Sequence, residues 1–121
     1  MKFATVPIEQ VPPVMPLADV TAHRPLVLVV DDETEVADSL VQILAENGFA
    51  AVAAYDGPDA IDTAHIMPPE LLVTYIDLPG MSGTELADAV KGAAPDCKVV
   101  LLSGPASTSE LLVRVSESLK L

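Results

Sequence analysis

Leu26-Val27-Leu28-Val29-Val30-Asp31-Asp32-Glu33 is the stretch that decides the fold. Its first five residues form a short apolar run rich in β-branched side chains, which is typical of a strand buried on both faces of a parallel sheet. Three carboxylates end the run. A helix is predicted from about Thr34 to Glu46, because apolar residues recur there at helical spacing and Asn47-Gly48 provides a stop.

The rest of the chain repeats this order of strand and helix. Strands are predicted at residues 50–54, 71–76 and 98–102, and helices at 57–65, 84–91 and up to 119, the last one capped by Ser107 or Thr108. Repeated βαβ units build a parallel sheet with right-handed crossovers, so the predicted architecture is a doubly wound α/β domain. Ligands of such domains bind outside the carboxyl ends of the strands. We therefore expect the chemistry at Asp31-Asp32, residues 75–77 and Ser103.

Composition narrows the classes of function. The 121 residues carry a formal net charge of −12, which argues against binding to nucleic acid or to an anionic membrane surface. Cys97 is the only cysteine, so an internal disulfide and a cysteine-based zinc site are excluded, and a buried filler is expected. Neither His23 nor His65 has a partner at metal or nucleophile spacing. No Walker or dinucleotide glycine pattern occurs, and an enzyme is not expected.

Residues 1–25 are expected to form a Pro-rich flexible tail, separate from a domain over residues 26–121. The tail holds five of the eleven prolines and its charges cancel, so the whole net charge of −12 lies in the domain. An idle tail and a tail that anchors on a partner both agree with this composition. No apolar stretch is long enough to span a bilayer and the tail is a poor signal peptide, so a cytoplasmic location is expected.

The acidic pair Asp31-Asp32 admits two interpretations. Adjacent carboxylates after a buried strand repel each other, and a cation between them relieves this repulsion. Oxygen ligands in a small cluster suit Mg²⁺. Alternatively, the pair and Glu33 only precede the first helix, where the helix dipole favours negative charge. Spacing alone leaves both interpretations open.

Three motifs resemble those of the receiver domains of bacterial response regulators. Val29-Val30-Asp31-Asp32-Glu33 resembles the family's first-strand acidic motif, residues 70–83 are similar to its third strand and following loop, and residues 99–104 resemble its fourth strand. The most specific element is the loop Leu78-Pro79-Gly80-Met81-Ser82-Gly83. The resemblance covers about residues 26–119.

The resemblance implies a flavodoxin-like sheet of strand order 2-1-3-4-5 and a role in a two-component phosphorelay. In that family, a histidine kinase passes its phosphoryl group to an aspartate at the end of the third strand. By resemblance, Asp31 and Asp32 take the Mg²⁺-binding role, and Ser103 takes the role of holding phosphoryl oxygens. Alternatively, Ser103 is only a residue at the end of the strand, with no role in binding phosphoryl oxygens.

The phosphoacceptor position departs from the family pattern. The family's acceptor lies four residues before the loop proline, and counting back from Pro79 gives Tyr75. A phenol with a pKa of about 10 is neutral at pH 7, cannot form an acyl phosphate and is expected to fill the acidic pocket with its ring. Asp77 shares the parity of Tyr75, so it is a candidate third metal ligand, a candidate substitute acceptor or a solvated loop residue.

The family pattern would continue with a fifth strand ending in Lys-Pro and a fifth helix, but the chain stops at Leu121. The expected strand order is therefore 2-1-3-4, with strand 98–102 as an apolar edge that recruits another strand. We expect dimerisation through this edge, pairing with a separate partner, or coverage by the Pro-rich tail.

The leading hypothesis is a receiver-like signalling module that acts by protein–protein contacts, because Tyr75 excludes normal phosphorylation. Its partner would be a histidine kinase or another two-component protein. The alternatives are a Mg²⁺-dependent aspartyl phosphoacceptor that uses Asp77, and a truncated product with little activity.

Overall fold

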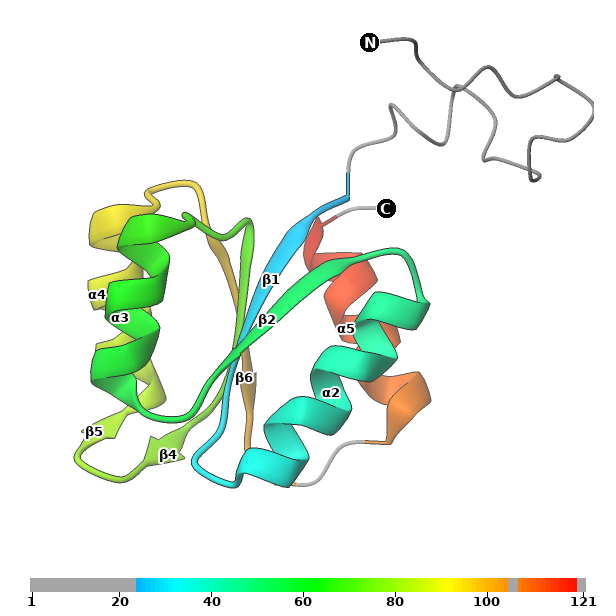
Figure 1. Ribbon diagram of the computed structural model, residues 1–121, viewed down its shortest axis with the longest axis horizontal. Helices are drawn as coiled ribbons and strands as arrows, with labels where there is room; N and C mark the ends of the chain where they lie inside the picture. The colour runs from blue at the N-terminus through cyan, green and yellow to red at the C-terminus, as the bar shows by residue number, and fades with distance from the viewer. Residues whose placement is uncertain (1–23, 105–106, 120–121) are drawn as a thin grey trace, which may run out of the picture.

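The computed structural model describes residues 24–104 and 107–119, which form a parallel sheet between two layers of helices (Figure 1). The four strands are β1 (Leu26–Val30), β2 (Ala50–Ala54), β3 (Leu71–Tyr75) and β6 (Lys98–Leu102). Their order is β2-β1-β3-β6, and every neighbouring pair is parallel. The predicted doubly wound fold and strand order are confirmed. The predicted tail lies outside the described residues except for its last two positions.

Two helices cover each face of the sheet (Figure 1). One face carries α3 (Gly57–Ile66) and α4 (Gly83–Ala93), and the other carries α2 (Thr34–Glu46) and α5 (Thr108–Leu119). Successive strand residues point to opposite faces. Leu28 and Val30 therefore join the α3–α4 core, while Val27 and Val29 join the α2–α5 core. This is why β1 is apolar at every position. No helix in the described part of the chain is long and apolar enough to cross a bilayer.

Side-chain caps set the starts of the last two helices. Ser82 and Glu85 form a reciprocal capping box at α4, in which Ser82 Oγ accepts from the Glu85 N–H at 3.0 Å. The helix consequently begins at Gly83, one residue before the predicted start. At α5, Ser107 Oγ accepts from the Glu110 N–H at 3.1 Å, which confirms the predicted cap.

The segment after β3 is more regular than the expected loop. β3 ends at Tyr75, and a small antiparallel ribbon follows from β4 (Asp77–Leu78) and β5 (Met81–Ser82). Pro79-Gly80 forms the turn between them, with Gly80 at a φ of 83°. Proline followed by a residue with positive φ is typical of a type II turn, so the predicted turn chemistry is confirmed.

The position of α5 differs from that of α4. α4 carries the chain from β3 to β6 over one face, and a right-handed continuation in the same direction would place the next helix on that face too. α5 instead lies on the face of α2, with Leu111 and Val115 buried in the α2–α5 core. It therefore covers the α2 face of the sheet. β6 is the sheet edge within the described residues.

Candidate functional site

The carboxyl ends of β1, β3 and β6 meet in an open pocket of about 420 Å³, here called the acidic pocket. It is lined by Asp31, Asp32, Glu33, Val36, Tyr75, Ile76, Asp77, Leu102 and Ser103. Carboxyl ends of parallel strands share one edge of the sheet, so all the residues that the sequence marked as candidates lie together. None of these nine lining residues is Lys or Arg, so the pocket has strongly negative walls.

Asp31 is the buried carboxylate of the pocket. Its side chain is 4% exposed, and its Oδ1 accepts a hydrogen bond from the Glu33 N–H at 2.9 Å. Burial raises the pKa of Asp31, and the neighbouring charges of Asp32 and Glu33 raise it further, while the Glu33 hydrogen bond opposes them. The ionised form is therefore held against a desolvation penalty that a bound cation would relieve.

The expected three-carboxylate metal set is not assembled. Asp32 and Asp77 are exposed, and Asp77 lies on β4, where it pairs with Ser82. Within residues 24–104 and 107–119, no three His, Cys, Asp or Glu side chains lie close enough together to hold a metal ion. The residues present do not fit a full Mg²⁺ site with Asp31, Asp32 and Asp77 as ligands. Mg²⁺ also binds through only one or two carboxylates, because it keeps several waters.

Tyr75 ends β3 and is half-buried. Its ring packs partly against the α2–α5 core and forms part of the pocket wall, so it does not fill the pocket as expected from its size. Burial raises the pKa of Tyr75, and the charges of Asp31 and Glu33 add to this shift. The phenol is thus further from ionisation at neutral pH than an ordinary tyrosine.

The backbone of Tyr75 is fixed by a close approach of α4. A Cβ at Gly83 would collide with the Tyr75 carbonyl oxygen, and the Gly83 N–H donates to the Ile76 carbonyl at 2.5 Å. Only glycine permits this contact. The sequence had suggested turn chemistry at Gly83, and the Ser82-x-x-Glu85 spacing was the readable signal for a helix start here.

Ser103 follows β6 and lines the same pocket. Its side chain is exposed. It lies where the resemblance places a phosphoryl-oxygen ligand, and the plain strand-end interpretation also agrees with this position. Away from the pocket, Cys97 is buried and His65 is exposed, as expected.

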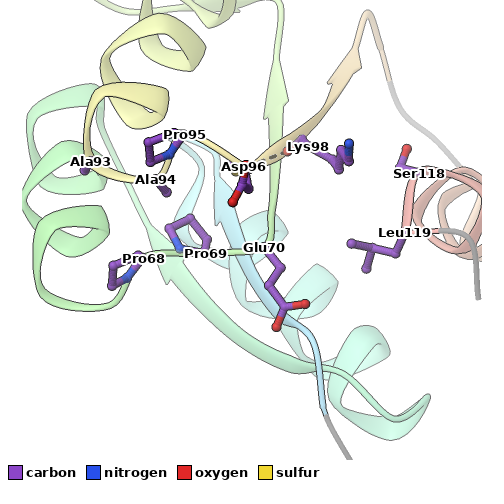
Figure 2. Close-up of a pocket in the computed structure, with 11 residues that line it drawn as sticks. Pro68, Pro69, Glu70, Ala93, Ala94, Pro95, Asp96, Lys98, Ser118 and Leu119 are labelled. Atoms are coloured by element: carbon purple, nitrogen blue, oxygen red, sulfur yellow. Dashed lines mark hydrogen bonds between the residues drawn. The ribbon is translucent and has the colours of Figure 1, made fainter.

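A second pocket, of about 470 Å³, lies at the amino ends of β3 and β6, opposite the acidic pocket, and was not predicted (Figure 2). Figure 2 shows Pro68, Pro69 and Pro95 on one side and Leu119 of α5 on the other. The prolines that precede β3 and β6 were the sequence feature from which this pocket could have been predicted. This pocket is the larger of the two, but it contains none of the candidate residues.

A doubly wound sheet with an acidic pair after its first strand and a hydroxyl residue after its last defines a receiver-type signalling domain. The family model for the response regulator receiver domain matches residues 27–118, and the chain belongs to this family. Receiver domains are signalling modules of two-component systems.

A curated relative agrees with this assignment. The response regulator MprA of Mycobacterium tuberculosis (strain H37Rv) is 33% identical over 84 residues, which are 69% of this chain and 36% of the relative. The chain thus spans little more than a third of the length of the curated relatives that it matches.

Solved structures share the fold. A two-component transcriptional regulator AraC from Clostridium phytofermentans has a TM-score of 0.71 and 29% identity, covering 79% of this chain and 92% of that one. The Vibrio cholerae chemotaxis protein CheY4 has a TM-score of 0.73, covering 79% of this chain and 99% of that one. At 18% identity, the second likeness concerns the fold alone.

Proposed function

We propose that this receiver domain signals through protein–protein contacts without accepting a phosphoryl group, and that it is not an enzyme. The observation that carries the proposal is Tyr75, which stands at the end of β3 on the wall of the acidic pocket. The family's phosphoacceptor belongs at this position. A neutral phenol offers no carboxylate for an acyl phosphate, and the close contact with Gly83 fixes the backbone there.

The charge of the pocket supports the same conclusion. A phosphoryl group would add about two negative charges to walls that contain no Lys or Arg among their nine residues. The raised pKa of Asp31 indicates that further negative charge is already disfavoured there. Phosphorylation would therefore need more cationic compensation than the lining side chains supply.

The proposed partner is a histidine kinase or another two-component protein in the cytoplasm. The net charge of −12 disfavours nucleic acid and anionic membrane surfaces as partners. We also propose that Mg²⁺ binds weakly at Asp31 and Asp32, where it would offset the burial of the Asp31 carboxylate. No step of the signalling function depends on this ion.

Intact mass spectrometry of the full chain with Mg²⁺ and acetyl phosphate tests the proposal. We expect no adduct. An adduct of one phosphate that disappears in Asp77→Ala but persists in Asp88→Ala would contradict it, because Asp88 is an exposed aspartate of α4 outside the pocket. That result would favour a Mg²⁺-dependent acceptor at Asp77, which is exposed and lines the pocket.

Thermal unfolding distinguishes a signalling module from a truncated product with little activity. The described domain has two aliphatic cores, one on each face of the sheet. A signalling module should unfold in one cooperative thermal transition. A broad, non-cooperative transition of the purified chain would favour the truncated product.

A further inference from the structure

The acidic pocket lies on a side of the domain that is rich in carboxylates (Figure 1). All four helices of the described part of the chain begin on this side, after the carboxyl end of a strand. Each helix has an acidic residue in its first turn, and these are Glu35, Asp59, Glu85 and Glu110. The negative potential of the pocket therefore extends over the surface around it.

The cationic side chains of the described residues lie elsewhere. Arg24 precedes β1, Lys91 lies in the last turn of α4 and Lys98 begins β6, so these three lie at the amino ends of the strands. Carboxylates also occur there, so the charge of that side is mixed. Arg114 of α5 donates to the Leu101 carbonyl at 2.9 Å. None of the four lines the acidic pocket, whose negative walls thus have no cationic partner within residues 24–104 and 107–119.

Asp31 is the pocket residue to which this matters most. Its side chain is 4% exposed, and its Oδ1 accepts from the Glu33 N–H. The charges that act on the pKa of Asp31 belong to Asp32 and Glu33, and both raise it. A buried carboxylate is costly unless a cation or a set of donors compensates it. Because Asp31 lines the pocket, a cation that enters the pocket can supply this compensation.

The remaining walls of the pocket are apolar. They consist of the half-buried Val36, the buried Leu102, the ring of Tyr75 and Ile76, which is a large apolar side chain at 40% exposure. The charge of Asp31 also raises the pKa of Tyr75, so the ring and the carboxylate lie within reach of one ligand. A matching ligand has a cationic end for the carboxylates and an apolar stem for the other walls.

We propose that the acidic pocket binds an arginine side chain of a partner protein. The guanidinium pairs with Asp31 and Asp32, its planar face lies against the Tyr75 ring, and its methylene stem covers Ile76. The carboxylates around the pocket attract a partner whose surface near this arginine is basic. This inference rests on the proposed function, because it identifies the contact through which a receiver domain without a phosphoryl group recognises its partner.

The arrangement of the carboxylates favours a guanidinium over a metal ion or an ammonium group. No three acidic, His or Cys side chains of the described residues converge on one point, as a tightly held metal ion requires. A guanidinium presents five N–H donors in a plane and can therefore reach carboxylates that lie apart. The lysine ammonium is compact and strongly hydrated, and it has no planar face for the Tyr75 ring.

NMR titration of the ¹⁵N-labelled full chain with Nα-acetylarginine amide tests the proposal. EDTA keeps Asp31 and Asp32 free of Mg²⁺. We expect the Ile76, Asp77 and Ser103 amides to shift, with a dissociation constant in the millimolar range, as suits a single side chain. Nα-acetylcitrulline amide has nearly the same shape without the charge and should bind at least about tenfold more weakly. Nα-acetyllysine amide should bind about threefold more weakly.

Variants of the chain locate the binding site. Asp31→Asn removes the buried charge and keeps an oxygen for the Glu33 N–H, so it should weaken binding of the arginine derivative about tenfold. Asp88→Asn is the matched control, because it removes the same charge from an exposed position of α4 outside the pocket and should change the affinity less than about twofold. Tyr75→Leu keeps the net charge and should weaken binding about threefold by removing the ring.

The same measurements can overturn the proposal. Pocket amides that do not shift with the arginine derivative mean that the pocket takes no guanidinium. Equal binding of the citrulline or lysine derivative rejects guanidinium recognition. Equal losses in Asp31→Asn and Asp88→Asn mean that the ligand only responds to the net charge of −12. The ¹⁵N spectrum of each variant reports whether it remains folded.

Failure of this inference is distinguishable from failure of the proposed function. A phosphate adduct in the mass experiment would reject the proposed function, and with it the role of the arginine contact in a receiver domain that is not phosphorylated. Absence of both the adduct and arginine binding would reject this inference alone.

Discussion

The ends of β1 and β3 lie in one pocket but have different chemistry. β1 delivers the buried Asp31 carboxylate and an exposed Asp32. β3 delivers the half-buried phenol of Tyr75. In the proposed function, the proposed metal-binding side chains at the end of β1 and the phosphoacceptor side chain at the end of β3 are separable, since the first are kept and the second is replaced.

Placing a carboxylate at the end of β3 should remove this difference. We expect Tyr75→Asp to raise the affinity for Mg²⁺ by about tenfold or more, because a further hard oxygen ligand enters a pocket that already holds Asp31 and Asp32. Isothermal titration with MgCl₂ measures the change. Tyr55→Asp is the control, since Tyr55 is exposed and outside the pocket lining. An unchanged affinity in Tyr75→Asp would mean that the two strand ends do not share ligands.

The end of β3 is also held in place by its close contact with Gly83 of α4. Gly83→Ala would force a Cβ against the Tyr75 carbonyl oxygen, so we expect a loss of about 2 kcal/mol in the free energy of unfolding. Urea denaturation measures it. Gly92→Ala in the same helix meets no atom within 4 Å and should stabilise by about 0.5 kcal/mol. Similar effects of the two substitutions would show that the contact is relaxed in solution.

A substitution at the end of β1 should instead raise the free energy of unfolding. Because the folded-state pKa of Asp31 is raised, its contribution to stability is fully present below the unfolded-state pKa and is lost as the pH rises through the folded-state pKa. Asp31→Asn keeps an oxygen for the Glu33 N–H, and in EDTA at pH 7 it should stabilise by about 1 kcal/mol.

The pH dependence of unfolding is the sharper readout for that variant. Thermal unfolding from pH 3 to pH 7 should be flatter in Asp31→Asn than in the parent chain. Asp32→Asn, at an exposed position, should change stability by less than about 0.5 kcal/mol. Destabilisation by Asp31→Asn at pH 7 would contradict the burial argument.

The smallest effect should be the influence of one strand end on the other. The charge of Asp31 raises the pKa of Tyr75, although burial is the larger cause. In a Tyr55→Phe background, ultraviolet titration follows Tyr75 alone, and Asp31→Asn should shift its pKa downward. Asp88→Asn, on α4 outside the pocket, should leave it where it was. An unchanged pKa of Tyr75 in Asp31→Asn would mean that the Asp31 charge does not act on the phenol.

Much of the fold was predictable because its signals are local. β1 is apolar at each position since both faces of the sheet are covered, and the stops at Gly48 and Gly80 have the positive φ values that suit glycine. The shared pocket of Asp31, Tyr75 and Ser103 also followed from parallel topology. The sequence gives the residue type at position 75, but the position of the Tyr75 ring in the pocket wall depends on how it packs against the α2–α5 core.

The features that the sequence did not reveal depend on non-local packing. An amphipathic α5 can cover either face of the sheet, and the stripe of Leu111 and Val115 does not say which. The close approach of Gly83 to Tyr75 likewise needs the angle at which α4 meets β3. How close Asp77 comes to the acidic pair in the shared pocket also depends on how the β4–β5 ribbon folds back after β3.

The side on which α5 lies has a consequence for local opening. α5 packs on one face of the sheet, so lifting it away breaks no ladder bond between the described strands. Its attachment rests on the apolar stripe of Leu111 and Val115 and on the bond from Arg114 to Leu101. The helix should therefore behave as a separate cooperative unit, detaching at a lower free energy than β1 or β3 unfolds. A partner that captured the detached helix would gain access to the side chains beneath it without disturbing the sheet.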